Sequence, residues 1–299
     1  MVLADVLLPQ VSSTLTVNSF WLASTVVAIL FVILYPLALA IYVNRRLHVG
    51  WRYFGFGALV FFVFQLITRA PLVTVLGIVL APQLKASLPF TYTWLLILVV
   101  TAGIFEEVGR YVGYRVLMRR DEKTWRKAIM YGVGHGGLES MLLVGGSLIL
   151  TLINVLTISA IGLNGLPAST RATVVQQFAA LNAEPGWLPL LAAWERLWTI
   201  PVHIALSVIV LQVFRRRNLG WLWLAILVHA LVDGVAAFIP QLLGSSVGVE
   251  VLVEGIIAVF GLLALWVIWA LRDRPQDDAV GAALEPPDRS LSAQAAVIG

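Results

Sequence analysis

Two adjacent glutamates and an arginine stand inside a stretch of sequence that is otherwise apolar enough to cross a membrane. Glu106, Glu107 and Arg110 fall within five residues, in a helix predicted from Tyr92 to Met118. Each charge near the bilayer centre costs at least about 2.5–3.5 kcal/mol, so these three need partners or a function. On a helix, the arginine lies three or four residues from each carboxylate and can pair with either. The set can supply a general base with a supporting residue; the alternative is a structural ion pair that ties helices together.

Three of the four histidines also fall inside apolar stretches. His135 is found in Gly-His-Gly-Gly-Leu-Glu, His203 follows a proline, and His229 begins His-Ala-Leu-Val-Asp. A single buried histidine is usually structural. Three on different helices, with two glutamates on a fourth, predict one shared polar site.

The depth of these residues in the membrane supports a single site. Each lies 8 to 13 residues from the nearest basic anchor at one end of its span, or roughly 12–20 Å at 1.5 Å per residue. The residues are Glu106, His135, His203 and His229. We expect one layer near the bilayer middle, reached by water from the cytoplasmic side.

Helical spacing places a carboxylate on the same face as two of the histidines. Glu139 follows His135 by four residues, and Asp233 follows His229 by four. A carboxylate in this position can fix the tautomer of an imidazole. Arg69, in another span, is expected to pair with Glu139 or with a glutamate further along the chain.

The helix that contains His203 has further polar residues. Arg196, Thr199 and His203 recur at i, i+3 and i+7 and share one face. Glu195 adjoins Arg196 but is expected to face a different helix, where it is the other candidate partner for Arg69.

These residue types suit hydrolysis of a peptide bond. The reaction needs a base to activate water, an acid for the leaving amine and donors for the oxyanion. A glutamate base with histidine donors supplies all three without a metal or other cofactor. Zinc is the alternative, held by His135, His203 and His229 with a carboxylate and an open position for water. No His-Glu-x-x-His run is present.

The composition identifies the class of protein that must position these residues. Of 299 residues, 60% are hydrophobic and only 12% are charged, whereas soluble domains have about 25% charged residues. The chain is therefore predicted to be a polytopic membrane protein with the lipid bilayer as a partner. The absence of cysteine excludes disulfides and thiol chemistry. The net charge of +4 is explained by the loops between spans and does not indicate a nucleic-acid partner.

We predict an all-α membrane bundle of about seven transmembrane helices. The expected spans are Phe20–Val43, Phe54–Val79, Tyr92–Met118, Ala128–Ile161, Leu188–Phe214, Leu219–Phe238 and Val247–Leu271. The second should kink near Pro71, and the fourth is glycine-rich and should bend or break. Between spans four and five, a short interfacial helix is expected around Val174 and Phe178.

The arrangement of basic residues predicts the orientation. Arginines and lysines follow spans one, three, five and seven, whereas the alternate loops contain only Lys85 and Arg171. By the positive-inside rule, the N-terminus lies outside and the C-terminus is cytoplasmic. We expect a short extracytoplasmic N-terminus (1–19), a seven-helix membrane domain with the site on spans three to six (20–271) and a disordered cytoplasmic tail (272–299).

Four motifs, in order, resemble the YhfC-type family of intramembrane proteases, which is related to the CAAX prenyl endopeptidase and bacteriocin-processing (CPBP) group. The resemblance covers about Phe54 to Leu271. The motifs are Glu106-Glu107-x-x-Arg110, Gly134-His135-Gly136-x-x-Glu139, Glu195-Arg196 with His203, and His229-x-x-x-Asp233. The wider group has three residues, not two, before the arginine, and it usually has Asn where this chain has Asp233. Glu139 and His203 are features of the YhfC-type pattern.

The resemblance implies a glutamic-type intramembrane endopeptidase in a bacterial plasma membrane, which cleaves a membrane-embedded or membrane-adjacent peptide or protein substrate. Glu106 would activate water, His135 and His229 would assist catalysis or bind the oxyanion, and Arg110 would order the two glutamates. Two other classes stay open on the residues alone. One is a proton-coupled transporter with a His/Glu relay, although no second copy of the Glu-Glu motif indicates repeat symmetry. The other is a scaffold with structural ion pairs.

Overall fold

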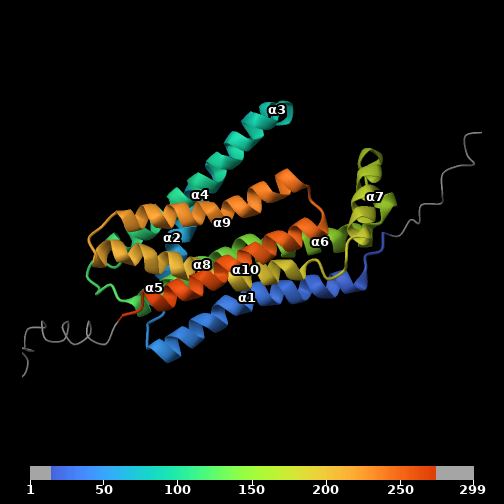
Figure 1. The fold of residues 1–299 in the computed structure, drawn as a ribbon. Helices are drawn as coiled ribbons and strands as arrows, with labels where there is room; N and C mark the ends of the chain where they lie inside the picture. Colours follow the sequence, from blue (N-terminus) through green and yellow to red (C-terminus); the bar gives the residue numbers. More distant parts are fainter. Residues whose placement is uncertain (1–14, 274–299) are drawn as a thin grey trace, which may run out of the picture.

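The computed structural model describes residues 15–273, and its regular structure in this range is helical throughout (Figure 1). In lipid, a helix satisfies every backbone hydrogen bond within its own segment. The elements are α1 (Ser19–Leu47), α2 (Arg52–Phe61), η1 (Phe62–Arg69), α3 (Ala70–Ala86), α4 (Leu88–Val116), α5 (Trp125–Glu139), η2 (Ser140–Gly145), α6 (Gly146–Ile161), η3 (Leu163–Gly165), α7 (Ala168–Ala183), α8 (Leu190–Arg215), α9 (Gly220–Leu243) and α10 (Val247–Ala270).

The prediction of seven spans is confirmed. Among residues 15–273, seven helical rods are long and apolar enough to cross a membrane, and two of them are composite: α2–η1–α3 and α5–η2–α6. The predicted and observed boundaries differ by at most seven residues. The predicted tail (272–299) lies outside the described residues after position 273, as does most of the predicted N-terminal segment (1–19).

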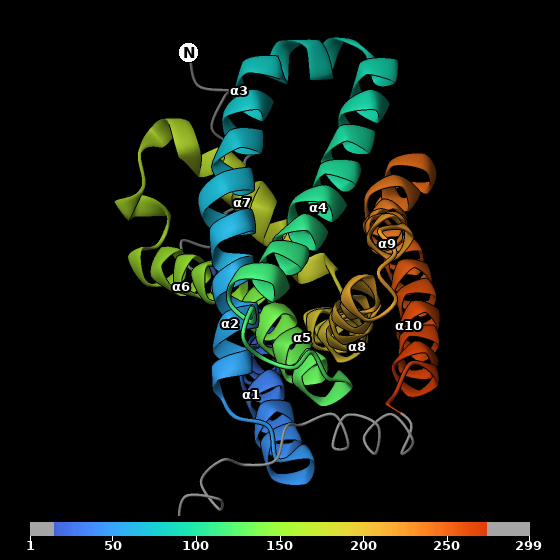
Figure 2. The same cartoon turned by 90° about the vertical axis from the view of Figure 1, so that its left-hand side faces the viewer.

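Helix α8 forms the centre of the bundle. In its most apolar window, 83% of the residues are buried, against 11–28% in the other six rods. It packs against α1, α5, α9 and α10, and Figure 2 shows it enclosed by α5, α9 and α10. The other rods expose large apolar side chains, as expected for a surface in contact with lipid tails. Polar residues of α8 can therefore contact side chains from several neighbouring helices.

Glycines allow the closest helix contacts. A Cβ on Gly57 of α2 would lie 1.9 Å from the carbonyl oxygen of Tyr131, and one on Gly134 of α5 would lie 2.0 Å from that of Phe54. Because no side chain fits there, α2 and α5 pack with their backbones almost touching, as small residues permit between membrane helices. This contact fixes the position of α5 and of the histidine next to Gly134.

Both composite rods contain a π-helical segment at the level where they separate. Proline lacks an N–H and crowds the carbonyl four residues earlier, so the chain before Pro71 widens into η1, where Thr68 Oγ1 donates to Val63 O, five residues back, over 2.7 Å. The two places where a kink or a bend was predicted, near Pro71 and within the fourth span, therefore coincide with η1 and η2, and both rods are continuous helices. Beyond η1 and η2, α3 packs on α4 whereas α6 packs on α1, and Figure 2 shows the two diverging.

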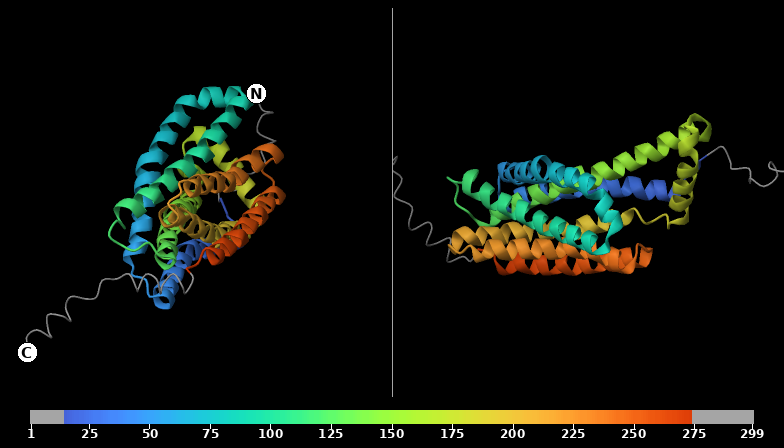
Figure 3. Two further views of the ribbon diagram at one scale, coloured as in Figure 1. Left: turned by 60° about the vertical axis from the view of Figure 1, so that its left-hand side comes forward. Right: turned by 90° about the horizontal axis from the view of Figure 1, so that it is seen from above.

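The segment between spans four and five contains helix α7, which lies across the end of the bundle (Figure 3). Its predicted interfacial residues, Val174 and Phe178, are buried in a small apolar cluster with Leu15, Trp21 and Val155. A helix is thus present between spans four and five, as predicted, and Val174 and Phe178 pack against α1 and α6.

Candidate functional site

Helix α4 presents its two glutamates to different surroundings. Arg110, which is fully buried, forms an ion pair with Glu107, and its Nη2 lies 3.7 Å from Oε2 of Glu106. The spacing-based prediction that one arginine can serve both carboxylates therefore holds. Glu107 also accepts a hydrogen bond from Nδ1 of His229 over 2.7 Å. Arg110 and His229 thus hold the carboxylate of Glu107 in the protein interior.

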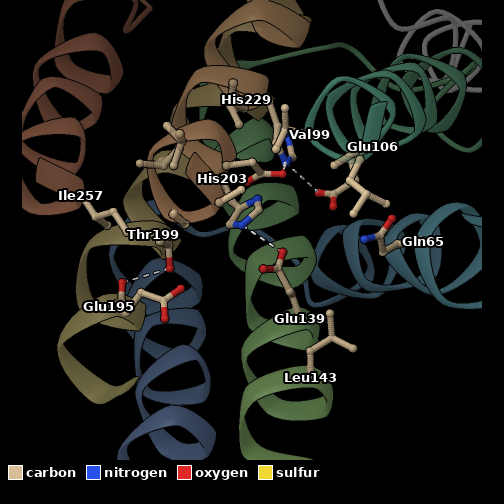
Figure 4. A pocket seen from close by; sticks show the side chains of 18 of the residues that line it. Gln65, Val99, Glu106, Glu139, Leu143, Glu195, Thr199, His203, His229 and Ile257 are labelled. Atoms are coloured by element: carbon tan, nitrogen blue, oxygen red, sulfur yellow. Dashed lines mark hydrogen bonds and ion pairs between the residues drawn. The ribbon is translucent and has the colours of Figure 1, made fainter. Parts of the chain in front are cut away.

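A cavity of about 390 Å³ lies against this set of residues, in the middle of the bundle. Its polar lining consists of Gln65, Arg69, Glu106, Glu139, Glu195, Arg196, Thr199, His203, His229 and Asp233. Figure 4 shows Glu106, His203, His229 and Glu139 pointing toward one another from four different helices. Glu107 and His135 are not among the described lining residues. Glu106 is therefore the glutamate of the pair that reaches the cavity.

His135 lies behind Glu106. Its Nε2 is 2.9 Å from Oε2 of Glu106, while Nδ1 is buried without a hydrogen-bond partner among the described residues. The ring also packs edge-on against Phe61, with centroids 5.2 Å apart. His135 therefore contacts the carboxylate of Glu106 without being among the lining residues of the cavity.

His203 has both of its ring nitrogens close to charged groups. Nδ1 lies 2.7 Å from Nη2 of Arg110, and Nε2 lies 2.9 Å from Oε2 of Glu139. A guanidinium group can only donate, so Nδ1 accepts and the hydrogen of the neutral imidazole lies on Nε2, toward the carboxylate. The geometry thus selects the tautomer of His203.

His229 points its other nitrogen toward the cavity. Because Nδ1 donates to Glu107, Nε2 faces the cavity, 3.8 Å from Oε2 of Glu106 and 3.7 Å from a carboxylate oxygen of Asp233. The predicted pairing of His229 with Asp233 within one helix is present. His229 therefore bridges the anchored glutamate and the cavity.

Two predicted pairings are wrong. Glu139 is four residues from His135 on α5, but it contacts His203 and Arg196 on α8, with Arg196 Nη1 2.8 Å away. Glu195 was expected to face a different helix, yet it lines the cavity and forms an ion pair with Arg196. For Glu139, packing of α5 against α8 brings Arg196 and His203 within reach, whereas Glu195 pairs with its own sequence neighbour on α8.

Arg69 is a third correction. It was expected to pair with Glu195 or Glu139, but its described hydrogen bonds go to neutral groups: Leu98 O at 2.5 Å, Thr101 Oγ1 at 3.3 Å and Gln65 Oε1 at 3.4 Å. Arg196 of α8 takes both of the predicted partners instead.

Glycines bring the helices that contain the site together, and sequence reasoning missed most of this role. A Cβ on Gly136 would lie 2.9 Å from the side chain of His203, and one on Gly103 would lie 2.7 Å from Ile226 O of α9. These contacts set α5 against α8 and α4 against α9. Gln65 was also missed as a lining residue; its position one helical turn before Arg69 was the available signal.

Comparison with known proteins identifies the family. The model of the YhfC intramembrane metalloprotease family matches residues 30–257. The chain is also 32% identical over 246 residues to the uncharacterized membrane protein YhfC of Bacillus subtilis (strain 168), a match that covers 80% of this chain and 92% of that protein. The chain belongs to the YhfC family. Together with its seven apolar helices, this makes it a multi-pass integral membrane protein. No solved structure matches it.

The YhfC family description implies a metal ion, and the donor set fits one. Glu106, His135 and His203 each offer a ligand atom, and these atoms lie within 4.8 Å of one another in buried positions. A carboxylate with two imidazoles suits zinc with an open position for water. His203 would exchange one of its present contacts for the ion. The group includes two of the three histidines in the alternative zinc set predicted from the sequence, with Glu106 in place of His229.

Proposed function

We propose that the protein is an intramembrane endopeptidase that hydrolyses a peptide bond in the central cavity. The observation behind this proposal is the position of Glu106, whose carboxylate lines the cavity beside two histidines at the middle of seven membrane helices. A buried base next to hydrogen-bond donors, in a space large enough for an extended peptide segment, is the arrangement that hydrolysis needs.

Glu106 is the proposed base. It takes a proton from a water molecule in the cavity while the water oxygen attacks the carbonyl carbon of the substrate. Oε2 of Glu106 is oriented by His135 at 2.9 Å and by Arg110 at 3.7 Å. Because Glu107 pairs with Arg110, the arginine is held in place when Glu106 changes its charge. Glu107 is thus a positioning residue.

His229 is the proposed donor to the substrate. Glu107 fixes its Nδ1–H, so Nε2 faces the cavity on the same side as Glu106. As the imidazolium, which also has a hydrogen on Nε2, it can donate to the oxyanion of the tetrahedral intermediate and stabilise it. When the C–N bond breaks, the proton taken up by Glu106 passes to the leaving amine. The carboxyl product keeps the oxygen of the water.

A metal ion, where bound, would be held by Glu106, His135 and His203. It would supply Lewis-acid activation of a water molecule at neutral pH. His229 would still face the cavity, and whichever of Glu139 and Arg110 stays in contact with His203 would orient its ring.

The function can be tested in membranes of cells that express the full chain. New protein N-termini are compared by mass spectrometry between wild type, Glu106→Gln and a control, Glu184→Gln, in an exposed loop. We expect cleavage products in wild type and control that are absent in Glu106→Gln. Identical products in all three would refute the proposal. A proton flux that depends on Glu106, without such products, would identify a transporter instead.

A further inference from the structure

Arg69 differs from the other two arginines of the site. Arg110 and Arg196 each form ion pairs with two glutamates. Arg69 is only 8% exposed and lines the same cavity, yet among the described residues no carboxylate lies within ion-pair distance of it. Its contacts are with a carbonyl oxygen, a hydroxyl and a side-chain amide. A buried charge without a counter-charge is expensive in a membrane and usually indicates a function.

The guanidinium group has donors left for a ligand. Nη1 and Nη2 each carry two hydrogens, and the described contacts use one on each, to Gln65 and Leu98. The remaining pair suits a carboxylate, which binds a guanidinium through two parallel hydrogen bonds. The carboxylates of Glu106 and Asp233 act on Arg69 only through space, from beyond ion-pair distance. They leave its hydrogen-bonding donors free.

The location of Arg69 is suited to holding a peptide. It ends η1, whose Gln65 lines the cavity across from Glu139 and Leu143 (Figure 4). This is the level at which α3 and α6 diverge. A peptide chain that contacts Arg69 can therefore also reach Glu106, because both residues line the same cavity.

We propose that Arg69 binds a carboxylate of the substrate and so makes the protein selective for peptides that place an acidic group in the cavity. This inference rests on the proposed endopeptidase function. The carboxylate can be an Asp or Glu side chain or a free C-terminus. An anionic group supplies the directly contacting counter-charge that glutamates provide to Arg110 and Arg196 but that no described carboxylate provides to Arg69.

The test uses the full-length protein in detergent and dye-labelled synthetic peptides of transmembrane length, made of leucine and alanine. One pair differs by a single central Asp or Asn, and a second pair ends in a free carboxylate or a carboxamide. Binding is measured by fluorescence anisotropy for wild type, Arg69→Gln, Arg69→Lys and the control Arg171→Gln, which changes an exposed arginine on α7. The two pairs distinguish an internal from a terminal carboxylate.

We expect wild type and the control to bind the acidic member of one pair about tenfold more tightly than its neutral partner. Arg69→Gln should bind both members equally, and Arg69→Lys should keep part of the preference. Equal binding of acidic and neutral peptides by wild type, or no binding of either, would overturn the proposal. So would a preference that survives in Arg69→Gln.

Cleavage of the same peptides, measured by mass spectrometry, separates this inference from the proposed function. An acidic preference in binding without any cleavage would support the Arg69 site and contradict the endopeptidase. Cleavage without an acidic preference in binding would support the endopeptidase and contradict the Arg69 site. If native mass spectrometry shows Arg69-dependent retention of an anionic lipid in place of the peptide preference, the peptide assignment is wrong.

Discussion

Glu107 accepts a hydrogen bond from Nδ1 of His229 over 2.7 Å, and this contact turns the other nitrogen of the ring toward the cavity and Glu106. The two neighbouring glutamates therefore have separate tasks. Glu107 fixes a histidine and an arginine inside the protein, while Glu106 faces the space where a substrate can bind.

The first prediction concerns the two glutamates. Glu106→Gln should lower cleavage by about 10²–10⁴-fold and leave the protein folded, because it removes a base without exposing a tightly paired charge. Glu107→Gln should destabilise the protein by about 3–5 kcal/mol, because it removes the close partner of buried Arg110. Thermal unfolding in detergent and cleavage measured on the same preparations provide the check. Equal loss of stability in both variants would contradict the division of tasks.

The second prediction tests the close packing of α2 on α5. Gly57→Ala places a methyl group against the backbone of Tyr131 and should cost at least about 1–3 kcal/mol. Gly55→Ala, on the same helix, meets nothing within 4 Å and serves as the matched control. Expression level and unfolding temperature should fall for the first variant alone. Similar behaviour of the two variants would show that the backbone contact is looser than described.

The third prediction concerns metal. Any zinc bound at the site should be lost in His135→Ala and His203→Ala and retained in His229→Ala, because the donor group contains Glu106, His135 and His203 but not His229. Elemental mass spectrometry of purified protein gives the zinc content per chain, independent of activity. Loss of zinc in His229→Ala alone would refute this donor set. A folded wild type without stoichiometric metal would leave Glu106 as the group that activates water.

The fourth prediction concerns orientation, which we propose from the distribution of basic residues. The chain has no native cysteine, so maleimide labelling of a single introduced cysteine has no background from other thiols of the protein. In intact cells, Ala172→Cys on α7 should react with a membrane-impermeant maleimide, whereas Arg119→Cys at the basic end should react only after lysis. Both positions are exposed in the protein. The opposite pattern would invert the topology.

Much of the fold and part of the site could be read from the sequence, because these features depend on local properties. Hydropathy and length fix seven spans, since the bilayer core requires about 20 apolar residues. Spacing on one helix fixes which residues share a face, so the pairing of Arg110 with both glutamates was predictable. The shared depth of the buried histidines also came from counting residues along each span.

The tertiary structure alone decided which residues of different helices meet. Glu139 shares a face with His135, yet it contacts His203 and Arg196. Within residues 15–273, Arg69 has no carboxylate partner at ion-pair distance, and Glu106 rather than Glu107 lines the cavity. These outcomes depend on the rotation and separation of neighbouring helices, which are set by backbone contacts such as those at Gly103 and Gly136. Sequence spacing describes one helix at a time and contains no measure of that rotation.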